Sequence, residues 1–106
     1  MEERRQYTRL KIPLPVRLET MSLDRKKVLD LKTRDISYSG TFITTLTSFP
    51  DRTRFILDFT IPSDNLEEFN DIESLMGCTG SMVRSTPHGI AIQFDKECQI
   101  ESLKSL

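Results

Sequence analysis

The sequence has few of the residues that build metal or catalytic centres. It contains one histidine, His88, and two cysteines, Cys78 and Cys98. This set cannot supply the closely spaced ligands of a structural zinc site, and a disulfide is not expected in a protein with so few cysteines. His88 stands between Pro87 and Gly89 without a nucleophile–base pair beside it, so we interpret it as a loop residue. We therefore predict no metal site and no enzyme activity.

Long apolar runs and glycine-rich loops are also missing. No run approaches the length of a membrane span, and the N-terminus is charged without the apolar core of a signal peptide. We therefore expect a cytoplasmic protein with reduced thiols and no membrane partner. The sequence has only four glycines and no tryptophan. It shows no alternation of strands with helices and no glycine-rich phosphate loop. A net charge of −1 argues against non-specific binding to DNA or RNA.

What the sequence does contain fits one small globular domain. The chain has 106 residues, of which 37% are hydrophobic and 29% are charged. Positive charge gathers near the N-terminus, at Arg4, Arg5, Arg9 and Lys11. Segment 64–73 is acidic, and we interpret it as a solvated surface without a functional assignment.

Alternating apolar and polar residues predict six short β-strands. The expected strands cover 14–19, 28–36, 41–46, 55–61, 75–83 and 90–94. Ile36 is apolar on the polar side of its strand, so we expect a bulge or the strand's end there. Asp95 resembles a helix N-cap before a weak apolar stripe, which predicts a short C-terminal α-helix. Short strands separated by turns favour a β-sandwich or a small closed barrel.

The first basic cluster lies on the segment 1–11, which we interpret as a flexible arm leading into a domain that covers 12–106. Arg5 and Arg9 are four residues apart, which puts both on one side of an extended or helical segment. Two guanidinium groups can clamp a phosphate or the O6/N7 edge of guanine. The alternative is a basic tail whose only role is solubility.

A second cluster follows the second expected strand, in the order Asp35, Ser37 and Gly40. A carboxylate can accept hydrogen bonds from the N1–H and N2–H₂ edge of guanine, and a serine hydroxyl can donate or accept. Gly40 would allow close approach of a ligand or a positive φ angle. The alternative is an ordinary turn, in which all three residues serve local geometry.

The pair of motifs, Arg5-x-x-x-Arg9 and Asp35-x-Ser37-x-x-Gly40, resembles the signature of the PilZ domain family of bacterial cyclic di-GMP receptors. The similarity covers nearly the whole chain. It extends to the entry into the first strand at 14–16, and to the closing strand pair at 80–84 and 89–94.

This resemblance implies a mainly all-β fold, a six-stranded antiparallel β-barrel with a terminal helix. It also implies that Arg5 and Arg9 grip guanine and phosphate from the arm, while Asp35, Ser37 and Gly40 hold the ligand from the barrel. Arg4 is expected to help hold a second, stacked cyclic di-GMP molecule. Binding would order the arm, and the signal would pass to an unidentified protein partner or to a second copy of the chain in a homo-oligomer. No cofactor is expected besides this ligand.

Two other functions stay open at this point. The chain could be a PilZ-like protein-interaction module that does not bind nucleotide, although such modules usually lack one of the two motifs. A small barrel that binds single-stranded nucleic acid would need exposed aromatic platforms, whereas the phenylalanines fall mostly on expected core positions.

Overall fold

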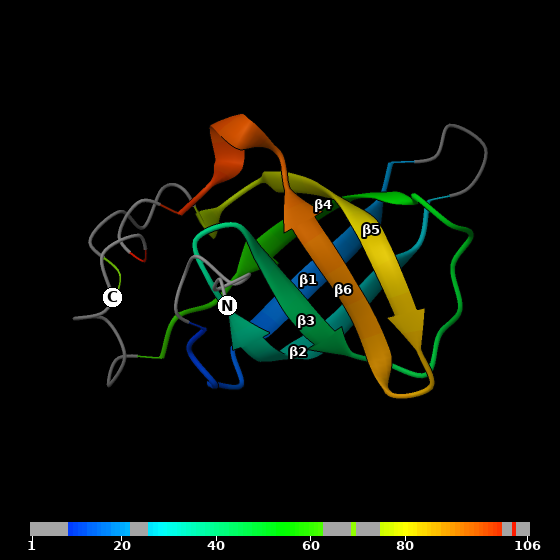
Figure 1. Cartoon of the computed structure of the whole chain (residues 1–106), viewed down its shortest axis with the longest axis horizontal. Coiled ribbons are helices and arrows are strands. Elements are labelled where there is room, and N and C mark those ends of the chain that lie inside the picture. The colour runs from blue at the N-terminus through cyan, green and yellow to red at the C-terminus, as the bar shows by residue number, and fades with distance from the viewer. Residues whose placement is uncertain (1–8, 22–25, 63–68, 70–74, 101–102, 104–106) are drawn as a thin grey trace, which may run out of the picture.

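The computed structural model describes residues 9–21, 26–62, 69, 75–100 and 103. Six β-strands and one turn of 3₁₀ helix are arranged in chain order (Figure 1). They are β1 (Pro15–Thr20), β2 (Val28–Ile36), β3 (Gly40–Thr44), β4 (Arg54–Phe59), β5 (Cys78–Thr86), β6 (Gly89–Phe94) and η3 (Lys96–Cys98).

The strands close into an antiparallel barrel in the order β1-β2-β3-β6-β5-β4, with β4 pairing back onto β1. The β5–β6 hairpin therefore sits between β3 and β4, as the diagonal ribbons of Figure 1 show. Closure gives each described strand a hydrogen-bonded neighbour on both sides, so none of them forms an open sheet edge. The expected six-stranded antiparallel barrel is confirmed.

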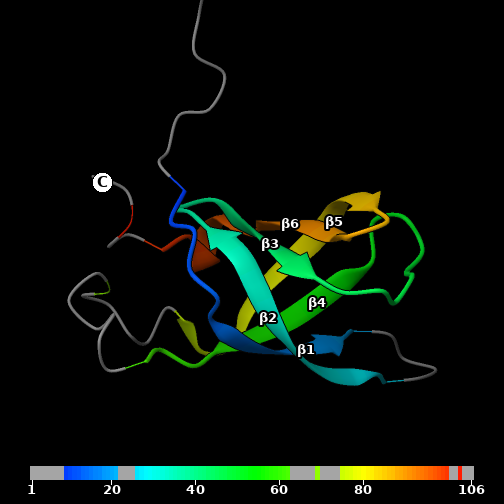
Figure 2. The same ribbon diagram turned by 90° about the horizontal axis from the view of Figure 1, so that it is seen from below.

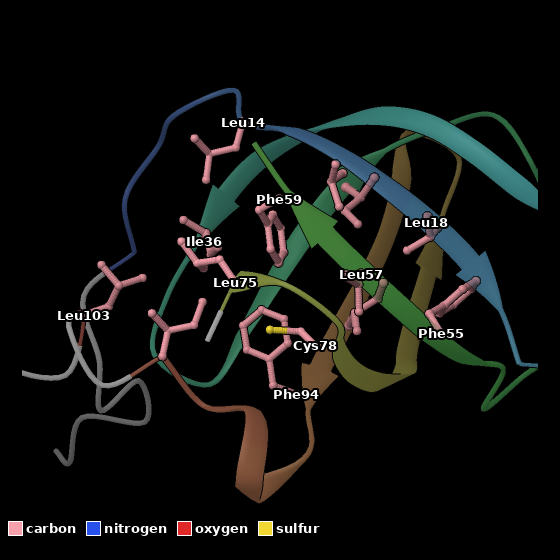
Figure 3. Packing of buried hydrophobic residues seen from close by; sticks show 14 of the residues in the cluster. Leu14, Leu18, Ile36, Phe55, Leu57, Phe59, Leu75, Cys78, Phe94 and Leu103 are labelled. Carbon is pink, nitrogen blue, oxygen red and sulfur yellow. The ribbon is translucent and has the colours of Figure 1, made fainter. Parts of the chain in front are cut away.

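Apolar side chains from all six strands fill the barrel interior. Leu18, Leu57 and Phe94 point into this core (Figure 3), together with Phe55 from the start of β4. Each fully buried side chain of this size contributes about 1.5–3 kcal/mol through the hydrophobic effect. Most of the acidic segment 64–73 lies outside the described residues, but Phe69 within it is buried in the same core.

A β-bulge at Arg34 changes the side on which the end of β2 points its residues. Thr33 pairs with Ile43 and Asp35 pairs with Phe42, so Arg34 is the extra residue. After the bulge Ile36 faces the core, where it is fully buried, and Asp35 faces outward beside Phe42. The expected bulge near Ile36 is confirmed, and it turns a carboxylate to the outside of the barrel.

A second bulge, at Val83, acts in the same way on β5. Met82 pairs with Ile92 and Arg84 pairs with Ala91, so Val83 is the extra residue. Met82 is buried in the core, and the bulge turns Arg84 to the outer face. The strand covers Cys78–Thr86, three residues later than expected, because the bend at Gly77, with a φ of 67°, precedes it.

The prediction of a C-terminal α-helix is wrong for the described residues. After Asp95 they form the 3₁₀ turn η3 instead. Asp95 occupies the N-cap position but makes no side-chain cap hydrogen bond. Its carboxylate instead accepts hydrogen bonds from Arg54 at 2.7 and 2.8 Å and from Thr79 at 2.6 Å. Nowhere in the described part of the chain is a helix long and apolar enough to cross a membrane.

The contacts of Asp95 predict a pH-dependent contribution to stability. The hydrogen bond from Arg54, followed by that from Thr79, lowers the pKa of Asp95 from 3.8 to about 2. Because the pKa of Asp95 is lower in the folded than in the unfolded state, the ionised carboxylate stabilises the fold when the pH is above the ordinary Asp pKa. This stabilisation is lost as the pH falls from about 4 to about 2. Because the pair is partly exposed, we expect Asp95→Asn to lower the free energy of unfolding by about 1 kcal/mol at pH 7.

Urea denaturation at several pH values measures this effect. The difference between the wild type and Asp95→Asn should shrink as pH falls below about 4. Asp30→Asn is the control, since Asp30 lies exposed and 3.4 Å from Arg17. A difference that stays constant from about pH 7 to about pH 2.5 would contradict the assigned role of Asp95.

Neither Cys78 nor Cys98 forms a disulfide. Burial, with smaller effects from Cys98 and Asp58, raises the pKa of the Cys78 thiol to about 12. Because the thiolate is the reactive form, Cys78 is a core residue without nucleophilic reactivity at neutral pH.

Candidate functional site

One row of outward-facing side chains crosses four neighbouring strands of the barrel. Asp35 on β2 pairs with Phe42 on β3, and Phe42 pairs with Ala91 on β6. Ala91 in turn pairs with Arg84 on β5. The two bulges place the charged residues at the two ends of this row, with an aromatic ring and a small side chain between them. The row forms the floor of the candidate site.

The N-terminal segment lies against the end of β2, beside this floor. Leu10 forms an isolated antiparallel bridge with Ile36, with N–H···O distances of 2.7 and 2.9 Å. Figure 2 shows the segment running past the arrowhead of β2. This bridge holds the neighbouring residue, Arg9, next to Asp35.

Asp35 is the centre of a charge cluster. Arg9 Nη1 donates to Asp35 Oδ1 at 2.8 Å, and Arg34 Nε donates to Asp35 Oδ2 at 3.2 Å. The Asp35 side chain is 4% exposed, whereas those of Arg9 and Arg34 are 36% and 58% exposed. Each carboxylate oxygen therefore has one guanidinium partner, and the carboxylate is buried whereas both partners are partly exposed.

Arg34 makes a second contact, with the aromatic ring of the floor. Its guanidinium carbon lies 3.9 Å from the centroid of the Phe42 ring, a cation–π distance. Phe42 is 3% exposed, although it does not belong to the core cluster inside the barrel. The ring is therefore a stacking surface on the outer face, with Arg34 lying over it.

These side chains line a hollow of about 310 Å³. The lining residues are Arg9, Lys11, Arg34, Asp35, Phe42, Arg84 and Ala91. Four of them are cationic and one is anionic, so the lining carries three positive charges on a chain with net charge −1. Such a local excess attracts anions, and arginine forks suit phosphate oxygens.

A larger hollow of about 490 Å³ lies beside the first and shares Arg84 with it. It is lined otherwise by the loop residues Asp51 and Arg52 and by Ser81, Met82 and Val83. None of the described residues of the two sequence motifs lines it, so we place the candidate site in the smaller hollow.

The turn between β2 and β3 fixes the position of Asp35. Ser37 donates to the Gly40 carbonyl oxygen through its amide at 2.8 Å and its hydroxyl at 3.3 Å. The Thr41 hydroxyl donates to the Asp35 carbonyl oxygen at 2.7 Å. Ser37 is buried, and neither Ser37 nor Gly40 lines the hollow. In this structure both serve the geometry of the turn, and their contact with a ligand stays a prediction.

Gly40 is required by a close approach between strands. A Cβ atom at this position would overlap the Ile92 carbonyl oxygen of β6, which is backbone and cannot move aside. Gly40 is not among the described residues with a positive φ angle. The reason for glycine is therefore the packing of β3 on β6 rather than a special turn conformation.

The structure brings together part of the predicted site. Arg9 and Asp35 meet directly, as the two motifs require, while Arg4 and Arg5 lie outside the described residues. Sequence reasoning did not assign five further lining residues to the site, namely Lys11, Arg34, Phe42, Arg84 and Ala91. Lys11 and Arg34 adjoin the motifs and could have been included on that ground. Arg84 depends on the bulge at Val83, whose position the sequence does not indicate.

The comparison with known families agrees with this geometry. The family model for the PilZ domain matches residues 3–106. A search of curated proteins finds no match. PilZ domains typically bind cyclic di-GMP and are non-catalytic receptors. With the family model matched over nearly the whole chain and a closed six-stranded barrel as its fold, the chain belongs to the PilZ domain family.

Proposed function

We propose that this chain is a cytoplasmic receptor for cyclic di-GMP that passes the signal to a protein partner. The observation that carries the proposal is the contact between Arg9 and Asp35, 2.8 Å apart at the edge of a cationic hollow. This contact joins the arm motif to the strand-end motif, as a ligand that uses both would need. Membership in the PilZ family supports the choice of ligand.

Guanine recognition is assigned to Asp35. A carboxylate accepts two parallel hydrogen bonds from the N1–H and N2–H₂ edge of guanine, an edge that adenine does not offer. A site that is built to satisfy a buried hydrogen-bonding group discriminates strongly against ligands that leave it unpaired. Ser37 and Gly40 hold the turn that presents Asp35, and Ser37 is proposed as a further ligand contact.

Phosphate recognition is assigned to the cations around the floor. Arg5 and Arg9 from the arm, with Lys11 and Arg84 from the described part of the hollow, would face the two phosphates of the ligand. Guanidinium–phosphate pairs are charge-assisted and often bidentate, so they are about twice as strong as neutral hydrogen bonds. Screening by salt is expected to weaken this part of the binding free energy.

The output is assigned to the arm, residues 1–11. Because Leu10 is paired with Ile36, we propose that ligand-induced ordering concerns the residues before Leu10. Ordering of these residues over the hollow would change the surface presented to a protein partner or to a second copy of the chain.

The competing functions are less well supported. All six phenylalanines lie in the described residues. Five lie in or against the barrel core and Arg34 covers the ring of Phe42, so the phenylalanines form no row of open platforms for single-stranded nucleic acid. An interaction module without nucleotide binding would have no need for the four cations that line the hollow together with Asp35.

Isothermal calorimetry with cyclic di-GMP, and with GTP as control, tests the proposal. We expect binding of cyclic di-GMP and no comparable binding of GTP. Because Arg4 is proposed to hold a second, stacked molecule, we expect two ligand molecules per chain. Arg4→Leu should then reduce the number of ligands per chain from two to one while leaving the first site intact. One ligand per chain in both proteins would contradict the role of Arg4, and no binding would contradict the proposed function.

A further inference from the structure

The recognition carboxylate is covered by the protein's own side chains. The Asp35 side chain is 4% exposed, and the two groups that pair with its oxygens, Arg9 and Arg34, are the exposed partners. Each Asp35 oxygen already accepts a guanidinium hydrogen bond and the side chain is 4% exposed, so we infer that an incoming base cannot reach both oxygens while both guanidinium groups stay in place. One of the two guanidinium groups must move.

Arg34 makes the two contacts that a guanine base would make at this place. Its planar guanidinium group lies over the Phe42 ring, 3.9 Å from the centroid. Its Nε–H donates to Asp35 Oδ2 at 3.2 Å. Both guanine and a guanidinium group are planar, can stack on an aromatic ring and can donate N–H hydrogen bonds to a carboxylate.

Of the two arginines, Arg34 is the less firmly held. Its contact with Asp35 is 3.2 Å long, against 2.8 Å for Arg9, and its side chain is 58% exposed, against 36%. Arg9 is further restrained because its neighbour Leu10 is bridged to Ile36. An incoming base that donates to Asp35 and stacks on Phe42 would replace both contacts of Arg34, so the exchange leaves neither the carboxylate nor the ring without a partner.

We infer that Arg34 occupies the base subsite formed by Asp35 and Phe42, and that the ligand base displaces it and stacks on Phe42. Arg34 is thus a competitor for the subsite rather than a contact of the bound base. This inference rests on the proposed function, since it concerns how cyclic di-GMP enters the same site. It assigns Phe42 as the stacking platform for a guanine.

The test is the affinity for cyclic di-GMP of variants that lack the Arg34 cation. Arg34→Ala and Arg34→Gln remove the competitor, and Lys32→Ala is the control for the loss of one positive charge, because Lys32 is exposed on the same strand and outside the hollow. We expect both Arg34 variants to bind about three- to tenfold more tightly than Lys32→Ala. This is the scale of losing one cation–π contact and one 3.2 Å ion pair whose cation is exposed. Thermal unfolding confirms that each variant is folded.

The outcomes separate this inference from the proposed function. If the wild type and Lys32→Ala bind cyclic di-GMP and the Arg34 variants bind equally or less tightly than Lys32→Ala, the inference is overturned and the proposed function stands. In that case Arg34 is either a direct ligand contact or irrelevant to binding. If neither the wild type nor any variant binds, both are overturned.

Discussion

Replacing Asp35 with alanine is expected to weaken the binding of cyclic di-GMP by about 100-fold or more, while the barrel stays folded. Removing one member of a buried, hydrogen-bonded charge cluster at a binding site typically costs about 2–5 kcal/mol of binding free energy. The Asp35 side chain is nearly inaccessible, and it is the one carboxylate among the described residues that line the hollow. Its loss removes the acceptor for guanine and leaves the cations without a counter-charge.

Asp30→Ala provides the matched control for this experiment. Asp30 lies on the same strand, and its side chain is exposed and 3.4 Å from Arg17. Both substitutions remove one negative charge from β2, so a general electrostatic effect would change the affinity equally. Calorimetry should show near wild-type affinity for Asp30→Ala and no measurable binding for Asp35→Ala. Equal affinities in the two variants would show that Asp35 does not recognise the base.

Replacing Gly40 with alanine is expected to destabilise the barrel and to abolish binding together. The new methyl group would overlap the Ile92 carbonyl oxygen, so β3 and β6 would have to separate. Overpacking against backbone costs about 1–3 kcal/mol of unfolding free energy, and we expect the upper end of this range. Because Gly40 pairs with Gln93 beside the turn that carries Ser37, the separation also shifts the presentation of Asp35.

Gly77→Ala is the control for the loss of a glycine. A methyl group there would meet no atom within 4 Å, but the residue has a φ of 67°, so we expect a cost of about 1 kcal/mol. Gly77 does not line the hollow, so the affinity for cyclic di-GMP should not change. Chemical denaturation of both variants measures the loss of unfolding free energy, and calorimetry measures their affinity for cyclic di-GMP. If the Gly40→Ala variant were as stable as the Gly77→Ala variant, the packing argument would be contradicted.

Local pattern was sufficient to predict most of the strands, whereas their closure into a barrel was implied only by the family resemblance. The strand Val28–Ile36 has the bounds expected from its alternation, and the apolar residue at 36 on the polar side indicated the bulge. The alternation of β4 and β6 was equally clear, because each of these strands buries one face in the core. In these strands the side chains that set the register are next to one another in the sequence.

The parts that the sequence did not predict depend on contacts between distant residues. The pairing of Asp95 with Arg54, 41 positions earlier, cannot be read from a local N-cap pattern. The contribution of Arg84 to the site depends on how β5 and β6 pair around Val83. Likewise, a local pattern does not show that the bulge pairs Phe42 with an outward-facing Asp35.

The location of the ligand on the outer face of the barrel can be measured by NMR. In a titration of the isotope-labelled chain with cyclic di-GMP, we expect the largest backbone amide shifts at 9–11, 34–42, 84 and 91. These residues form the row, the turn and the N-terminal segment around Asp35. Amides of β1, which do not border the hollow, should change little. Shifts centred on the larger hollow at Asp51 and Arg52, or no shifts at all, would contradict the account.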